Sequence, residues 1–249
     1  MSLKEFDIAL VTGASRGIGA ETTRQLAARG LAVHTVARTS GSLDELAAET
    51  GCTPHYLDVA DADAVTAAFG GLDIDVLVNN AAAPGGAGPV FEQTPEAVDG
   101  LNAANIAGPI NCLRAVVPGM RQRNRGHIVN LGSMAGLYAS PGMPAYAATK
   151  AAIHSLSQTL RLDLYGTDIR VTEISPGRVE TGIHLRLAGG DPAEAAKAFY
   201  EGYDCLRPED IAAAILFALD APTRMDVTLM EILQTRQVYG GADFHKEDD

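Results

Sequence analysis

The chain has 249 residues, 47% of them hydrophobic and 20% charged, which is typical of a folded globular protein and excludes a disordered one. Its length suits one α/β domain with a large core. The net charge of −12 argues against nucleic acid and anionic membranes as partners, because such a surface would repel both. No apolar run approaches the roughly 18 residues that span a bilayer, and the polar N-terminus lacks the pattern of a signal peptide, so we expect a cytoplasmic protein.

The cysteines and histidines show no pattern typical of a metal site or a disulfide. Cys52, Cys112 and Cys205 lie far apart and form neither a disulfide framework nor a Cys-x-x-Cys pair. We interpret them as small buried side chains in a reducing compartment. The six histidines are scattered, with no pair at the helical spacing of metal ligands. The sequence therefore predicts no catalytic metal.

Short apolar, β-branched runs alternate with longer helical patterns along almost the whole chain. We expect strands at residues 7–11, 32–37, 53–57, 75–79, 126–131, 170–174 and 226–233. We expect helices at residues 17–29, 42–49, 62–69, 94–123, 144–165 and 208–219. Several strands are apolar at consecutive positions, as in a parallel sheet that is covered on both faces. The predicted fold is a single doubly wound, Rossmann-type α/β domain over residues 1–249, with a seven-stranded parallel sheet and helices on both faces.

The open end of this sheet is where we expect a ligand. In doubly wound folds, ligands bind beyond the carboxyl ends of the strands. Residues 183–203 form an insertion between the sixth predicted strand and the last helix. An insertion at that place can cover the open end, so we expect it to act as a substrate lid.

A glycine-rich turn follows the first predicted strand. Its glycines allow a tight turn and a close approach to a pyrophosphate, and the next helix presents its positive N-terminus. The spacing Gly-x-x-x-Gly-x-Gly differs from the Gly-x-Gly-x-x-Gly of the dinucleotide fingerprint. We expect the phosphates of a cofactor to be bound by Gly13, Ser15, Arg16, Gly17, Ile18 and Gly19.

The end of the second predicted strand indicates NADP(H) as the cofactor. An acidic residue there would bind the 2′-hydroxyl of the adenosine ribose and repel a 2′-phosphate. The stretch Val36-Ala37-Arg38-Thr39 contains no carboxylate. Arg38 can instead form a forked contact with a phosphate, and we expect Arg16 to project toward the same space. The alternative is a preference for NAD, with both arginines as ordinary surface cations.

Tyr146 and Lys150 stand four residues apart at the start of a predicted helix, which makes them neighbours on one helix face. A free phenol has a pKa near 10, so it is a poor general base at neutral pH. An ammonium within about 4 Å stabilises the phenolate by up to roughly 4 kcal/mol at an effective dielectric near 20, and the positive nicotinamide of an oxidised cofactor adds to this effect. We therefore expect Tyr146 to act as a proton donor or acceptor near neutral pH.

Three further motifs follow predicted strands at the same edge of the sheet. Ser133 comes after the fifth strand, where its hydroxyl can hold a substrate oxygen and stabilise charge that develops there. Asn79-Asn80-Ala81 ends the fourth strand, and Pro176-Gly177-Arg178-Val179-Glu180-Thr181 ends the sixth.

Taken together and in this order, these motifs resemble the short-chain dehydrogenase/reductase family over residues 6 to about 220. The matching elements are Thr-Gly-x-x-x-Gly-x-Gly, Asn-Asn-Ala, Ser, Tyr-x-x-x-Lys and Pro-Gly. The resemblance implies that Tyr146 is the catalytic acid/base, that Ser133 orients the substrate carbonyl, and that Lys150 binds the nicotinamide ribose and lowers the pKa of Tyr146.

The resemblance also implies a set of cofactor contacts and a homo-oligomer, either a dimer or a tetramer. Asp58 and Val59 would contact the adenine, Asn80 would support the adenosine ribose, and Val179 and Thr181 would hold the carboxamide. Ala81, Pro176 and Gly177 belong to the same cofactor-binding motifs, as do Tyr146 and Lys150.

Asn105 matches the family's catalytic asparagine in the helix after the fourth strand. The family's asparagine is thought to hold, through its main-chain carbonyl, a water linked to the lysine, which requires a gap in the helical hydrogen bonding. Pro109 lies four residues later and has no N–H to donate. The sequence therefore predicts that the Asn105 carbonyl lacks its helical donor.

Three positions depart from the family's pattern. Ala82 replaces the usual glycine after Asn-Asn-Ala, so its backbone has to avoid the angles that only glycine adopts. Pro109 inside a helix is unusual. The last predicted strand, at residues 226–233, differs from the common family ending, which puts the pocket wall and the oligomer contacts formed there in doubt.

The sequence thus predicts an NADP(H)-dependent oxidoreductase that transfers a hydride between the nicotinamide and a carbonyl or secondary alcohol carbon of a small molecule. The expected pocket wall is apolar, with Arg178 and Arg186 as the cations nearest to the lid, and it comprises Ala83, Met134, Ala139, Pro141, Met143, Leu185 and Leu187. The alternative is a non-catalytic NADP-binding sensor or scaffold, which would need only the cofactor-binding half of these residues.

Overall fold

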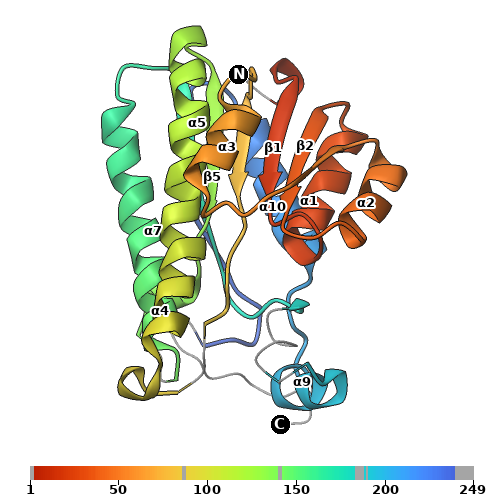
Figure 1. Ribbon diagram of the computed structural model, residues 1–249, viewed down its shortest axis with the longest axis vertical. Helices are drawn as coiled ribbons and strands as arrows, with labels where there is room; N and C mark the ends of the chain where they lie inside the picture. The colour runs from red at the N-terminus through yellow and green to blue at the C-terminus, as the bar shows by residue number, and fades with distance from the viewer. Residues whose placement is uncertain (1–2, 86–87, 140–141, 183–187, 189, 239–249) are drawn as a thin grey trace.

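The computed structural model describes residues 3–85, 88–139, 142–182, 188 and 190–238. Within them a seven-stranded sheet has the order β3-β2-β1-β4-β5-β6-β7 (Figure 1). The strands are β1 (Ile8–Thr12), β2 (Ala32–Ala37), β3 (Thr53–Tyr56), β4 (Val76–Asn79), β5 (Gly126–Leu131), β6 (Ile169–Pro176) and β7 (Leu229–Ile232). Every pair of neighbouring strands is parallel, which confirms the predicted fold class.

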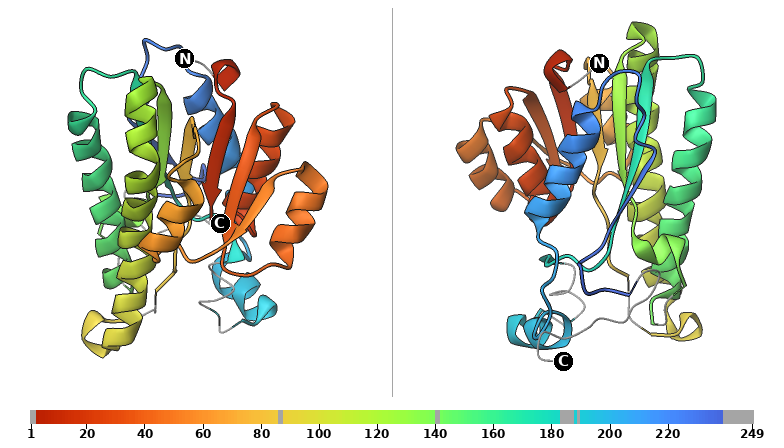
Figure 2. Two further views of the ribbon diagram at one scale, coloured as in Figure 1. Left: turned by 45° about the horizontal axis from the view of Figure 1, so that its top comes forward. Right: turned by 180° about the vertical axis from the view of Figure 1, so that it is seen from behind.

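Helices cover both faces of the sheet (Figures 1 and 2). One face carries α1 (Gly17–Ala28), α2 (Ser42–Thr50) and α10 (Pro208–Asp220), and the other carries α3 (Ala62–Phe69), α5 (Gly108–Arg123) and α7 (Pro144–Asp163). Among the described helices, none combines the length and apolar character needed to cross a bilayer. The short elements are η1 (Leu3–Glu5), η2 (Val90–Glu92), α4 (Pro95–Asn102), α6 (Met134–Leu137) and α9 (Pro192–Phe199).

The two covering layers explain why the central strands are apolar at consecutive positions. All residues of β4, β5 and β6 are buried, because side chains on both sides of each strand contact a helical layer. The core divides accordingly into two clusters of buried residues. Leu26 and Ile215 belong to the cluster beneath α1 and α10, and Phe69 and Val116 belong to the one beneath α3 and α5.

The expected single helix at residues 94–123 is wrong. The structure divides it into α4, a π-helical turn at Ala103–Ala107 and α5. The N–H of Gly108 bonds to the carbonyl of Ala103, five residues earlier, which is the π-helical pattern. Pro109 follows at once and has no N–H for the Asn105 carbonyl. The interruption that the sequence predicts at Asn105 therefore takes the form of a π turn.

Ile215 in α10 should be essential for the α1 and α10 layer. Its side chain is fully buried, so Ile215→Ala removes apolar contacts and leaves a cavity. We expect the free energy of unfolding to fall by about 2–5 kcal/mol in urea denaturation. Ala213→Ser, at an exposed position on the same helix, should change it by less than about 0.5 kcal/mol. Equal losses in the two variants would contradict this packing.

Candidate active site

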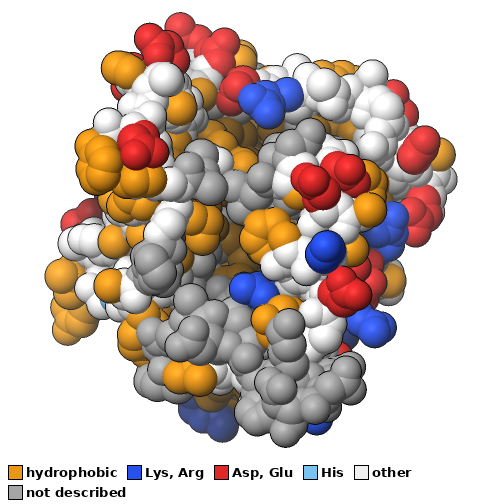
Figure 3. All heavy atoms as spheres, turned by 90° about the horizontal axis from the view of Figure 1, so that it is seen from below, with side chains coloured by type: hydrophobic (Ala, Val, Ile, Leu, Met, Phe, Trp, Pro, Cys, Tyr) orange, Lys and Arg blue, Asp and Glu red, His pale blue; other side chains and the backbone are white. Residues whose placement is uncertain are grey.

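A cavity of about 630 Å³ opens beyond the carboxyl ends of the strands. Figure 3 shows this end of the molecule, where hydrophobic side chains line a hollow. Two of the predicted site residues, Gly19 and Asn105, do not line the cavity. All the others do: Gly13, Ser15, Arg16, Gly17, Ile18, Arg38, Asp58, Val59, Asn80, Ala81, Ser133, Tyr146, Lys150, Pro176, Gly177, Val179 and Thr181.

The glycine-rich loop between β1 and α1 is packed tightly against the end of β4. Gly13 has a φ of +67°, and a Cβ there would lie 2.8 Å from the Cα of Ala81. A Cβ on Gly19 would lie 2.5 Å from the carbonyl oxygen of Gly13. Both glycines therefore allow close approach within the protein itself, which explains why Gly19 belongs to the motif without lining the cavity.

Asn80 joins this loop to the end of β4. Its side-chain amide donates to the carbonyls of Thr12 (2.9 Å) and Gly13 (3.1 Å). The hydroxyl of Thr12 accepts in turn from the backbone N–H groups of Asn80 and Ala81, both at 3.0 Å. In the structure the Asn80 amide thus holds the glycine-rich loop, while the residue also lines the cavity.

The two arginines expected near a 2′-phosphate lie against different loops. Arg38 follows β2, and its exposed guanidinium lies 4.0 Å from the carboxylate of Asp58, which follows β3. Arg16 extends instead toward Gly182 beyond β6, where a Cβ would lie 3.0 Å from its Cδ. Arg38 is therefore at the end of β2, where the adenosine ribose is expected, and the side chain of Arg16 lies against the segment that follows β6.

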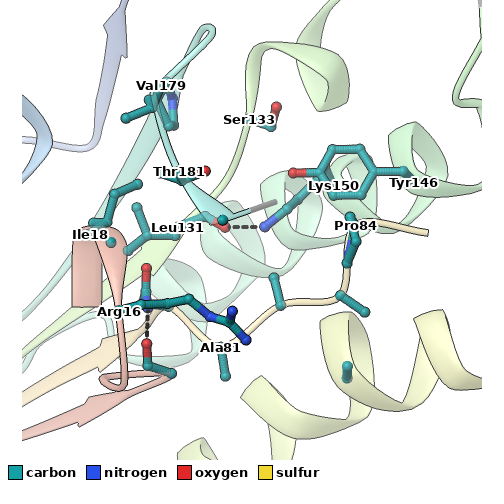
Figure 4. A pocket seen from close by; sticks show the side chains of 18 of the residues that line it. Arg16, Ile18, Ala81, Pro84, Leu131, Ser133, Tyr146, Lys150, Val179 and Thr181 are labelled. Atoms are coloured by element: carbon teal, nitrogen blue, oxygen red, sulfur yellow. Dashed lines mark hydrogen bonds between the residues drawn. The ribbon is translucent and has the colours of Figure 1, made fainter. Parts of the chain in front are cut away.

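Tyr146, Ser133 and Lys150 come together on the opposite side of the cavity (Figure 4). Pro144 begins α7, so Tyr146 lies in its first turn, and Ser133 is the N-cap of α6. Burial raises the pKa of Tyr146 to about 12, and a hydrogen bond with Ser133 opposes this shift. The sequence predicts that Lys150 lowers this pKa; in the structure, burial dominates and the shift is upward.

Lys150 lies beside Tyr146, with its ammonium 5.7 Å from the centre of the phenol ring. The ammonium donates a hydrogen bond of 2.7 Å to the carbonyl of Leu131, at the end of β5. Burial lowers the pKa of Lys150 to about 8, and the negative charge of Glu173 opposes this shift. Glu173 was not among the predicted site residues, although a carboxylate in the middle of a predicted strand is a signal in the sequence.

Asn105 is buried in the π-helical turn, and its side chain binds two other elements. Its amide accepts from the N–H of Ala83 (2.7 Å) and donates to the carbonyl of the same residue (3.1 Å). It also donates to the hydroxyl of Thr149 (3.0 Å), which donates to the carbonyl of Tyr146 (2.8 Å). Asn105 therefore fixes the loop after β4 relative to the first turn of α7.

Ala82 lies in this loop, and the structure shows why alanine is accepted there. Among the described residues other than glycine, Asn124 alone has a positive φ. The backbone at Ala82 therefore avoids the angles that only glycine adopts, as the sequence predicts.

The pocket wall agrees in part with the expected one. Ala83, Met134 and Met143 line the cavity, whereas Ala139 does not. Pro141, Leu185, Arg186 and Leu187 lie outside the described residues, as does part of the lid expected at 183–203. Sequence reasoning missed several other lining residues, including Pro84, Leu131, Tyr138, Phe199 and Gln237, because they lie outside the motifs.

Arg178 contacts the described part of the segment that was expected to form a lid. Its guanidinium donates to the carbonyl of Phe199 (3.1 Å), the last residue of α9, and lies 5.2 Å from the ring centre of Tyr203. The hydroxyl of Tyr200 donates to the carbonyl of Thr181 and accepts from its N–H. The end of α9 is therefore anchored to the segment that follows β6.

Comparisons with known proteins agree with this geometry. The short chain dehydrogenase family model matches residues 7–188. An uncharacterized short-chain type dehydrogenase/reductase of Sinorhizobium fredii is 38% identical over 244 residues, which cover 98% of each protein. An NADP-dependent 3-hydroxy acid dehydrogenase of Escherichia coli K12 is 36% identical over 248 residues, which cover 96% of this chain and 100% of that protein.

A solved structure gives the same result. The closed form of a serine dehydrogenase complexed with NADP+ has a TM-score of 0.90 at 35% identity, over 96% of this chain and 100% of that chain. Because the family model and these relatives cover most of the sequence, the chain belongs to the short-chain dehydrogenase/reductase family.

Proposed function

We propose that the protein is an NADP(H)-dependent oxidoreductase that moves a hydride between the nicotinamide and a carbonyl or secondary alcohol carbon. The observation that carries this proposal is the position of Tyr146, Ser133 and Lys150. All three line the same cavity as the glycine-rich loop and Arg38. A phenol, a hydroxyl and an ammonium can thus act beside a dinucleotide bound along the strand ends.

The cavity fits NADP(H) in two respects. The glycine-rich loop leads into the N-terminus of α1, which favours a pyrophosphate. Arg38 provides a cation for a 2′-phosphate and, by pairing with Asp58, reduces the repulsion from the nearest carboxylate. Similar proteins support the assignment, since a 36% identical relative is NADP-dependent by name and a structure of TM-score 0.90 is a complex with NADP+.

Proton transfer, orientation of the substrate and binding of the ribose would each fall to particular side chains of this chain. Tyr146 is protonated at neutral pH and would donate a proton to a carbonyl oxygen, while its raised pKa makes it a weaker acid than a free phenol. Ser133 would hold that oxygen, and Lys150 would bind the ribose hydroxyls and favour the phenolate once the proton has left. Asn105 would keep the first turn of α7 in place. The nicotinamide, when bound, supplies or accepts the hydride.

Tyr146→Phe tests the catalytic part of the proposal. NADPH oxidation by the wild type would be followed by absorbance over a panel of ketones and aldehydes. With the best substrate we expect kcat to fall roughly 10²–10⁴-fold in the variant, because the proton donor is lost. NADPH binding, measured by fluorescence, should persist.

Tyr138→Phe is the matched control, since Tyr138 lines the same cavity but its hydroxyl binds Glu231. Its effect on kcat should be less than about tenfold. Undiminished turnover in Tyr146→Phe would exclude the proposed acid. Wild-type protein that binds NADPH but reduces no compound in the panel would favour the non-catalytic sensor.

Arg38→Asp tests the choice of cofactor. The substitution replaces the cation expected at the 2′-phosphate with a charge that repels it. The ratio of kcat/KM for NADPH to that for NADH should fall by at least about 10–100-fold, the value of one hydrogen bond to a charged group. Arg29→Asp makes the same change of charge at an exposed position after α1 and should leave the ratio unaltered. An unaltered ratio in Arg38→Asp as well would contradict the assignment.

A further inference from the structure

Glu173 is a carboxylate inside the sheet, in β6 between β5 and β7. All residues of β6 are buried, and Glu173 is only 1% exposed. A carboxylate in such a place loses its hydration and persists only with close partners. Neither the strand's packing nor the roles proposed above for the cavity residues account for it.

Two hydrogen bonds hold this carboxylate, and the one with His154 places it beneath the face of α7 that carries Tyr146 and Lys150. Ser175 donates to one oxygen at 2.7 Å, and the imidazole of His154 bonds to the other at 2.7 Å. His154 lies four residues after Lys150, which lies four residues after Tyr146. The three side chains therefore follow one another along a single face of the helix.

The same carboxylate is packed against the backbone that holds the catalytic side chains. A Cβ on Gly132 would lie 2.4 Å from an oxygen of Glu173 and 2.4 Å from the hydroxyl of Ser175, so the lack of a side chain at Gly132 allows this close packing. Gly132 stands between Leu131, whose carbonyl accepts from Lys150, and Ser133. Glu173 thus lies directly behind the anchor points of both Lys150 and Ser133.

We propose that Glu173 is a positioning residue that keeps Lys150 in its charged form within the cavity. This inference rests on the proposed function, because the charge matters only where Lys150 serves a reaction. Lys150 needs such support, since burial lowers its pKa to about 8 and a nearby negative charge works in the opposite direction. Without the carboxylate, the pKa of Lys150 would lie further below its usual range.

Other charged and titratable groups also face this region. Arg161 on α7 interacts with the charge of Glu173. On β7, Glu231 pairs in register with Ser175, and it binds the hydroxyl of Tyr138 from α6. A test therefore has to distinguish the effect of the Glu173 charge from that of Glu231, which carries the same charge on the next strand, further away from β5.

The charge on Lys150 can be measured directly in the free protein. The chain has four lysines, Lys4, Lys150, Lys197 and Lys246, so NMR of protein labelled with [13C]lysine resolves few signals, and Lys150→Met identifies the one of interest. In the wild type, we expect the chemical shift of the Lys150 signal, followed against pH, to have its inflection at a pH of about 8. In Glu173→Gln it should move down by roughly one pH unit, because the stabilising charge is gone.

Three variants complete the experiment. Glu173→Asp keeps the charge and should restore most of the shift. Glu231→Gln makes the same change of charge on β7 and should move the inflection by less than half as much. Glu173→Leu, which suits a buried strand, replaces Glu173→Gln if that variant does not fold, and the same downward shift is expected.

An inflection that stays in place in Glu173→Gln, or that moves equally in Glu231→Gln, overturns the inference. The pH profile of kcat for carbonyl reduction gives a second readout. In Glu173→Gln the alkaline limb of this profile should move to lower pH by the same amount as the NMR inflection of Lys150. A uniform loss of kcat with an unmoved limb would show a merely structural role. If the NMR shift occurs but the wild type neither binds NADPH nor oxidises it, the proposed function fails while the control of the Lys150 charge stands.

Discussion

Parallel pairing of the strands is the constraint on which the cavity depends. Because all strands run in one direction, the loops that follow β1 to β6 meet at one edge and line one cavity. The register is reinforced by side chains, since Asn79 lies opposite Asn130 and their amides share a hydrogen bond of 2.9 Å. A slip of one residue would turn the side chains of a strand to the other face and remove this alignment.

The architecture was predictable from the sequence because its signals are long and periodic. Buried strands such as β4 and β5 are apolar at consecutive positions, and the helices between them are long enough to show an amphipathic period. Short elements lack this information. The helix α6 has only four residues, which make one turn. The π turn at Ala103–Ala107 depends on how the backbone carbonyls are paired where Pro109 offers no N–H.

The residues that line the cavity were predictable for a different reason: most of their motifs follow a strand, so parallel pairing brings them to one edge, and Tyr146 and Lys150 lie beside them at the start of α7. What the sequence could not provide is the balance of burial against charge. It predicts a lowered pKa for Tyr146, whereas the depth of the phenol raises it. The direction of Arg16 and the contact of Glu173 with Gly132 also depend on packing between residues distant in the sequence.

The central claim is that NADP(H) lies along the strand ends with its nicotinamide beside Tyr146, and a crystal structure of the complex with NADP+ tests it most directly. The account predicts the 2′-phosphate next to Arg38, the pyrophosphate over the loop that contains Gly13, and the reactive carbon of the nicotinamide next to the hydroxyl of Tyr146. A cofactor bound in the reverse direction, or a nicotinamide outside the reach of Tyr146 and Ser133, would contradict it.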